Sequence, residues 1–389
     1  MAKLFLGTRE VTPAVYKSDE IKIDRTLVNG TLSNGTEILD FTKNNITAIA
    51  NGCFAFAYYN NQTISGNVDL SNVITAGTYS LSKTFYGCSN ITSVDLSNLT
   101  GIVGMECCDS MCYNCDSLTS LDLKSVKKIY GDKCAYQMCM YADNLESIDL
   151  SSLEEIGTTS YNENTSFSGL YMAFMNCRSI NTAIDFSKLK FIRGAYACGQ
   201  MFNGCRNIPS ADLRSLTAIC SMQGAAQMFA GNDKLASVNL SSLTTISGSN
   251  ACMSMFDGCD ILSNVSLPAL TTVSGGYTCR GMFSNCTSLT SMTFPSLNSI
   301  NSSYAFQNMF SGCTSLTSLS FPALTSSSFG TNRNQFQYII SGVTGCTIHF
   351  PSNFDPDNPN KTFDVTTLAG YPNFGGTNTA LAYDLTATE

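Results

Sequence analysis

Residues 309–319 read Met-Phe-Ser-Gly-Cys-Thr-Ser-Leu-Thr-Ser-Leu, and nearly the same residues occupy positions 282–292, which lie 27 residues earlier. The cysteine of this stretch recurs along most of the chain. It stands at Cys88, Cys115, Cys177, Cys205, Cys259, Cys286 and Cys313, with Ala142 and Asn232 in the two remaining slots. A fixed period of about 20 to 50 residues indicates a solenoid, in which each unit buries its apolar face by stacking on its neighbours.

A second column of residues keeps the same period independently of the cysteines. It is the middle position of triplets such as Val94-Asp95-Leu96, and most intervals along it are 27 residues. Its members are Asp40, Asp69, Asp95, Asp122, Asp149, Asp185, Asp212, Asn239, Ser266, Thr293, Ser320 and His349. The interval of 36 residues before Asp185 predicts a polar loop inserted near residues 158–168.

Each unit predicts one strand and one short helical segment. Apolar and polar residues alternate over residues 288–294, as in a strand with one buried face. A second short apolar pair, Leu243 and Ile246, is followed by Ser-Gly turn residues, and then Cys252, Met255 and Phe256 have helix-like spacing.

The sequence therefore predicts an α/β repeat solenoid that is leucine-rich-repeat-like. We expect about 12 coils of about 27 residues, with one parallel sheet and short helices or turns on the opposite side. The expected divisions are an N-terminal attachment segment and cap over residues 1–37, the solenoid over 38–350, and a C-terminal cap or attachment segment over 351–389.

Units such as residues 309–319 resemble the BspA-like type of leucine-rich repeat, which is found in bacterial and viral surface proteins. The resemblance covers roughly residues 38–350. The segment Leu4–Pro13 is similar to the opening element of phage structural proteins. Together these resemblances imply a non-enzymatic surface that binds other molecules.

Composition excludes several classes of protein. The net charge is −8 and basic residues are scattered singly, so nucleic-acid binding is not expected. No apolar stretch approaches the roughly 20 residues of a membrane span, and the apolar run of Leu4–Leu6 is too short for a signal peptide. We therefore expect neither membrane insertion nor a conventional secretory leader.

Few residues offer catalytic or metal chemistry. His349 is the only histidine, which argues against an imidazole-dependent nucleophile, and we predict no catalytic residue and no cofactor. Cys112 and Cys115 have a spacing typical of metal ligands. One cysteine per coil in a fixed register, replaced twice by Ala142 or Asn232, instead indicates a packed row, so no metal is expected.

The aspartate column is the candidate binding feature. Neighbouring carboxylates in one row repel each other, and two explanations for the row stay open. Hydrogen bonds from flanking Ser93, Ser97, Ser147 and Ser151 would stabilise it, or the stripe attracts a cation or a basic partner. The candidate residues are Asp40, Asp69, Asp95, Asp122, Asp149, Asp185 and Asp212.

We expect a virion structural or receptor-binding protein of a bacteriophage, in a tail, baseplate or head appendage. Its partners would be other virion proteins and a host-surface protein or glycan, with a homo-oligomer such as a trimer left open. The alternative is a bacterial cell-surface adhesin of the BspA-like type. An enzyme acting on glycans is a third hypothesis, which the near-identical environments of the aspartates disfavour.

Overall fold

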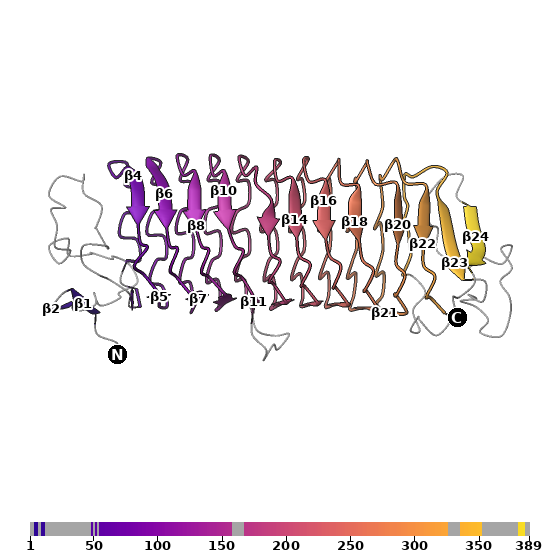
Figure 1. Ribbon diagram of the computed structural model, residues 1–389, viewed down its shortest axis with the longest axis horizontal. Coiled ribbons are helices and arrows are strands. Elements are labelled where there is room, and N and C mark those ends of the chain that lie inside the picture. Colours follow the sequence, from indigo (N-terminus) through magenta and orange to yellow (C-terminus); the bar gives the residue numbers. More distant parts are fainter. Residues whose placement is uncertain are drawn as a thin grey trace.

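The computed structural model describes residues 4–6, 9–11, 48–49, 51–52, 54–157, 167–325, 335–351 and 380–385. The repeat forms a solenoid of stacked coils, and Figure 1 shows its strands as two rows along the long axis. The predicted parallel solenoid is confirmed. The structure describes about ten coils, and Asp40 lies outside the described residues.

Each coil contributes strands to two sheets, whereas the sequence predicted one sheet. The first sheet has three four-stranded sections. Its strands are β4 (Gly66–Asp69), β6 (Ile91–Asp95), β8 (Ser120–Asp122), β10 (Ser147–Asp149), then β12 (Ile184–Asp185), β14 (Ser210–Asp212), β16 (Ser237–Asn239), β18 (Asn264–Ser266), and finally β20 (Ser291–Thr293), β22 (Ser318–Ser320), β23 (Thr347–Pro351) and β24 (Ala380–Leu385).

The second sheet is continuous and has ten parallel strands. They are β3 (Ala48–Ile49), β5 (Thr75–Ala76), β7 (Gly101–Val103), β9 (Lys128–Tyr130), β11 (Glu155–Ile156), β13 (Phe191–Arg193), β15 (Ala218–Cys220), β17 (Thr245–Ser247), β19 (Thr272–Ser274) and β21 (Ser299–Asn301). The second residue of the short apolar pair noted in the sequence, such as Ile246, is the inward residue of these strands. Ile246, for example, pairs with Ile219 on one side and Val273 on the other, and all three are fully buried.

Two further strands pair outside the main sheets, and β24 extends the first sheet. β1 (Leu4–Leu6) and β2 (Arg9–Val11) form an antiparallel pair. β24 lies within the predicted C-terminal segment and pairs in parallel with β23. The last segment therefore adds a strand to the first sheet.

The third side of each coil, here called the turn side, holds a series of turns. It is the stretch between a second-sheet strand and the cysteine column, such as residues 249–258 in one coil. No α-helix occurs within the described ranges, so of the predicted short helices or turns the structure has turns. The buried positions come in adjacent pairs, Ala251 with Cys252 and Met255 with Phe256, so the side chains repeat every four residues. That repeat contains the same three- and four-residue spacings as a helix.

Backbone bonding explains why the turn side is not helical. Met255 N–H donates within the coil to Cys252 O at 3.2 Å, but Phe256 N–H donates to Met282 O of the next coil at 2.9 Å. Ser254 has a φ of 51°, which turns alternate peptide groups toward the neighbouring coil. Half of the N–H groups on this side thus hold adjacent coils together, as the two sheets do on theirs.

The core between the three sides is a continuous apolar column. Phenylalanine rings stack in parallel from coil to coil, with centroids 5.4–5.9 Å apart. This row contains Phe174, Phe202, Phe229, Phe256, Phe283 and Phe310, all fully buried. Removing one such ring costs about 3–5 kcal/mol in a protein core, so the row fixes the register of the stack.

Candidate functional site

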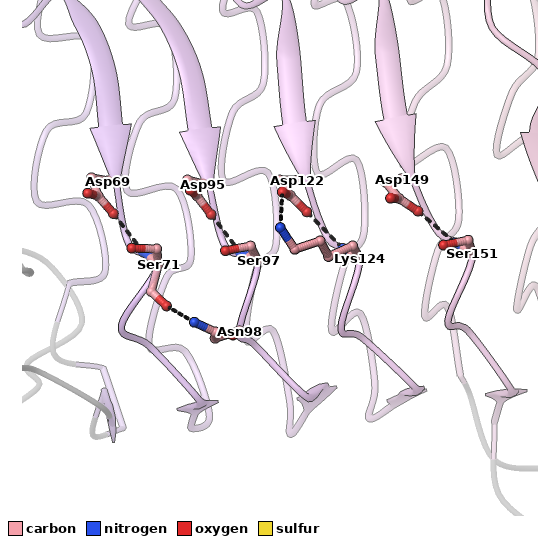
Figure 2. A network of polar contacts seen from close by, with 9 residues as sticks. All are labelled: Asp69, Ser71, Asp95, Ser97, Asn98, Asp122, Lys124, Asp149 and Ser151. Carbon is pink, nitrogen blue, oxygen red and sulfur yellow. Dashed lines mark hydrogen bonds and ion pairs between the residues drawn. The ribbon is translucent and has the colours of Figure 1, made fainter.

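The aspartate column lies at the ends of the first-sheet strands, where each carboxylate closes a turn. Figure 2 shows Asp69, Asp95, Asp122 and Asp149 in successive coils. In each coil the Oδ1 atom accepts a hydrogen bond from the backbone N–H two residues later, as from Ser97 to Asp95 at 2.8 Å. The same bond forms at all six described aspartates of the column, with N–O distances of 2.8–3.1 Å.

These contacts replace those expected from side-chain hydroxyls. The backbone N–H groups of Ser97 and Ser151 donate to the preceding carboxylates. Among the described residues the hydroxyls of Ser93 and Ser147 make no hydrogen bond to the aspartates. An aspartate that accepts from the main chain two residues on is a common turn-forming device, so the column has a local structural role.

The column changes character where proline enters the turn. Asn239 keeps the bond, accepting from Ser241 N–H at 3.2 Å. In the next three coils the residue two positions later is Pro268, Pro295 or Pro322, which has no N–H. The column residues there are Ser266, Thr293 and Ser320. The Asp or Asn acceptor therefore disappears at the same coil as the N–H donor that it serves.

The second carboxylate oxygen of each aspartate is not used by the turn. At Asp122 and Asp212 it binds the side chain of the following basic residue, since Lys124 Nζ lies 3.2 Å from Asp122 Oδ2 and Arg214 Nε lies 2.7 Å from Asp212 Oδ2. The Arg214 guanidinium holds the pKa of Asp212 below its usual range. Asp69, Asp149 and Asp185 are exposed. The aspartate column therefore forms a solvent-facing row of carboxylates, which we call the acidic stripe.

The cysteine column packs as predicted and also forms hydrogen bonds. Each thiol points at a backbone carbonyl of the preceding coil, as Cys205 to Phe174 O and Cys313 to Phe283 O, both at 2.9 Å. Asn232 serves the same purpose, because its Nδ2 donates to Phe202 O at 2.8 Å. A small side chain with one donor therefore fits this slot better than a purely apolar one. Burial raises the pKa of Cys88, Cys259 and Cys313 to about 12.

The pair Cys112 and Cys115 is fully buried within this core. Burial raises the pKa of Cys112 well above its usual range, which disfavours the thiolate that a metal requires. Over the described ranges no group of three or more His, Cys, Asp or Glu side chains is arranged to hold a metal ion. His349 lies in β23 beside Ser320.

The second sheet carries a surface feature that was not predicted from the sequence. We call it the basic cluster, formed by residues of β9, β11 and β13 and those just before them. Its members are Lys127, Lys128, Tyr130, Glu154, Glu155, Lys190, Phe191 and Arg193. The signal was present, because Lys-Lys at 127–128 and Glu-Glu at 154–155 are one repeat apart and must lie side by side.

A family model assigns the repeat. It describes a BspA type leucine rich repeat region, and its matches span residues 78–182, 170–273 and 225–344. The chain belongs to this family. The matched BspA-type region contains the aspartate column from Asp95 to Ser320 and the whole basic cluster.

Comparison with solved structures finds other leucine-rich repeat proteins. A protein from Bacteroides ovatus is 18% identical with a TM-score of 0.24, covering 78% of this chain and 87% of its own. A leucine rich cell surface protein from Faecalibacterium prausnitzii is 15% identical with a TM-score of 0.31, covering 84% and 87%. An internalin from Listeria monocytogenes is 14% identical with a TM-score of 0.21, covering 72% and 81%. These similarities are too low to transfer a function to the BspA-type chain.

Two further findings are negative. No curated protein matches the chain. The described residues contain no helical segment with the length and hydropathy of a membrane span.

Proposed function

We propose that this BspA-type protein acts by recognition or adhesion, presenting its solenoid to a protein or glycan partner at the bacterial cell surface. The observation that carries the proposal is the repeat itself. Three sides bonded from coil to coil, around a continuous apolar core, form a long and regular surface on which side chains keep fixed positions. Solenoids commonly use such surfaces for binding.

We infer that binding, and not catalysis, is the activity. The aspartates of the stripe sit in matching turns, each with one oxygen bonded to the main chain. Paired catalytic acids need different environments that push their pKa values apart. Turnover of a glycan that is abolished by a single change in the stripe would overturn this part of the proposal.

The cellular setting separates the two candidates raised by the sequence. The BspA-type family favours a cell-surface adhesin over a phage virion protein. The resemblance of residues 4–13 to phage structural proteins keeps the virion as the second candidate; of that segment the structure describes only the strands β1 and β2. Mass spectrometry of cell envelopes and of purified virus particles from one culture decides between them. We expect enrichment in envelopes, and enrichment in particles would replace the first candidate with the second.

The acidic stripe is a proposed contact for a basic partner or a cation. The unused oxygens of the exposed Asp69, Asp149 and Asp185 face solvent, so a positively charged surface can approach them without breaking the turns. Changing Asp149 and Asp185 together to Asn removes two charges and keeps the acceptor for the turn, as Asn239 does naturally. We expect weaker binding to the partner cell or particle with an unchanged melting temperature. Unchanged binding would leave the stripe with its turn-forming role alone.

A further inference from the structure

The basic cluster is a local reversal of charge on an acidic protein. The chain carries a net charge of −8, yet four cationic side chains and two carboxylates gather on three adjacent strands. Lys128 Nζ lies 3.4 Å from Glu155 Oε2, and Lys190 Nζ lies 3.5 Å from Glu154 Oε2, so both carboxylates are paired. Among the described residues, Lys127 and Arg193 have no carboxylate within 4.0 Å.

The two unpaired cations are accessible and one is held in place. Lys127 is exposed, and the guanidinium carbon of Arg193 lies 4.0 Å from the centroid of the Phe191 ring. A guanidinium that rests on an aromatic ring loses little freedom on binding and keeps its planar set of N–H donors for a carboxylate. The guanidinium can bind both oxygens of one carboxylate at once.

An aromatic side chain completes the cluster in the neighbouring strand. Tyr130 is 36% exposed, which is high for so large a ring. Ile129, Ile156 and Ile192 pair in register, so Tyr130 and Arg193 lie two coils apart with Gly157 at the level between them. Two coil steps correspond to about 9.6 Å along the axis at the usual strand spacing.

Glycine is required at position 157, so this position contributes no side chain to the outward row. The φ of Gly157 is 88°, and a Cβ atom there would lie 1.8 Å from the carbonyl oxygen of Arg193. The main chain of Arg193 occupies the place that a side chain at position 157 would take, so among the described residues the outward row passes from Tyr130 to Arg193 with no side chain between them. The aromatic ring of Tyr130 and the guanidinium of Arg193 lie on either side of Gly157.

We propose that the basic cluster binds an acidic polysaccharide whose sugar rings carry carboxylates. A chain laid along the solenoid axis would place a sugar ring against Tyr130, over Gly157, and its carboxylates on Lys127 and Arg193. Aromatic rings pack on the apolar faces of sugars, while the unpaired cations supply the charge complementarity. This inference rests on the proposed recognition function and adds to it the surface and the ligand class.

The test uses the full chain with polygalacturonate as the acidic probe and its fully methyl-esterified form as the uncharged control. Isothermal titration calorimetry should show binding to the acid form only, weakened by added salt. The double variant K127Q/R193Q should bind at least about tenfold more weakly, because both charge-assisted contacts are lost. Equal binding of the two polymers, or no binding of the acid form, overturns the proposal.

A matched variant controls for general loss of positive charge. K234Q/R280Q removes one exposed lysine and one arginine, and Arg280 also lies over a tyrosine ring, 5.8 Å from the centroid of Tyr277. Its affinity should equal that of the unaltered chain, and an equal loss in both double variants overturns the site.

A cell-binding assay separates the two proposals. Cell binding without polygalacturonate binding removes only the ligand class, whereas absence of cell binding removes the recognition function.

Discussion

The two halves of the first sheet close the same turn by different means. From Asp69 to Asn239 a side-chain oxygen accepts the N–H of the residue two positions later. From Ser266 to Ser320 that residue is a proline, which fixes φ and has no N–H to satisfy. The comparison shows that the acidic column follows the needs of the backbone. A run of aspartates along a solenoid is therefore not in itself evidence of a binding site.

The largest effect is expected where the donor is buried. Ser97 is only 6% exposed, so Asp95→Ala leaves its N–H without an acceptor and should lower the free energy of unfolding by about 1–3 kcal/mol. Asp95→Asn keeps the acceptor and should stay within about 0.5 kcal/mol of the unaltered protein. Urea unfolding followed by circular dichroism measures both. Equal losses would mean that the charge matters and the acceptor does not.

The cysteine column provides a reference that does not change between the halves. Cys205→Ala and Cys313→Ala each remove a thiol that donates to a carbonyl at 2.9 Å, so each should cost about 1 kcal/mol. Asn232→Cys should be tolerated, because the thiol can donate to the same carbonyl as the amide. Thermal denaturation of the three variants tests this. A clear difference between Cys205→Ala and Cys313→Ala would contradict a shared role.

A smaller effect is expected when a proline turn is converted. Pro295→Ser should destabilise by about 0.4–1 kcal/mol, because the unfolded chain gains conformational freedom and the new N–H lacks a side-chain acceptor. Adding Thr293→Asp supplies that acceptor and should restore part of the loss. If the second substitution restores nothing, the two kinds of turn are not equivalent and the comparison fails.

The smallest effect concerns the charge on the stripe. Arg214→Ala removes the guanidinium that lowers the pKa of Asp212, so that pKa should rise toward its usual value, as measured by NMR titration. Because the folded-state pKa is depressed, the stabilisation is present above the unfolded-state pKa and is lost as the pH falls through the folded-state value. The two proteins should therefore differ in stability at neutral pH and converge in strong acid. A constant difference across the pH range would contradict this.

Periodicity was enough to predict the stacking but not the shape of one coil. Two columns at an interval of 27 residues predict that residues 27 positions apart are neighbours. In the structure Asp95 pairs with Asp122 and Ile219 pairs with Ile246. The sequence left short helices and turns open for the turn side, because Cys252, Met255 and Phe256 satisfy both patterns. Only the positive φ of Ser254 and the bonds to the next coil distinguish them, and an isolated sequence motif does not encode bonds between coils.

The candidate site was only partly predictable for a similar reason. The position of the aspartates followed from the repeat, but their acceptor role depends on the conformation of the turn, which the residue types alone left open. The basic cluster is assembled across the coil that contains the insertion, so Glu154 and Lys190 are 36 residues apart and the regular period hides their contact. The structure describes residues on both sides of that insertion, and residues 158–166 lie outside the described part.

The hydrogen bonds between coils run along the solenoid axis on all three sides, which sets how the molecule responds to force. A pull between its two ends loads these bonds in line, so coils should peel away one after another from an end. Each coil of 27 residues would lengthen the chain by about 90 Å at roughly 3.4 Å per extended residue. The protein would then yield in steps of nearly equal length, with a longer step at the coil that contains the insertion, and each step would dissipate work.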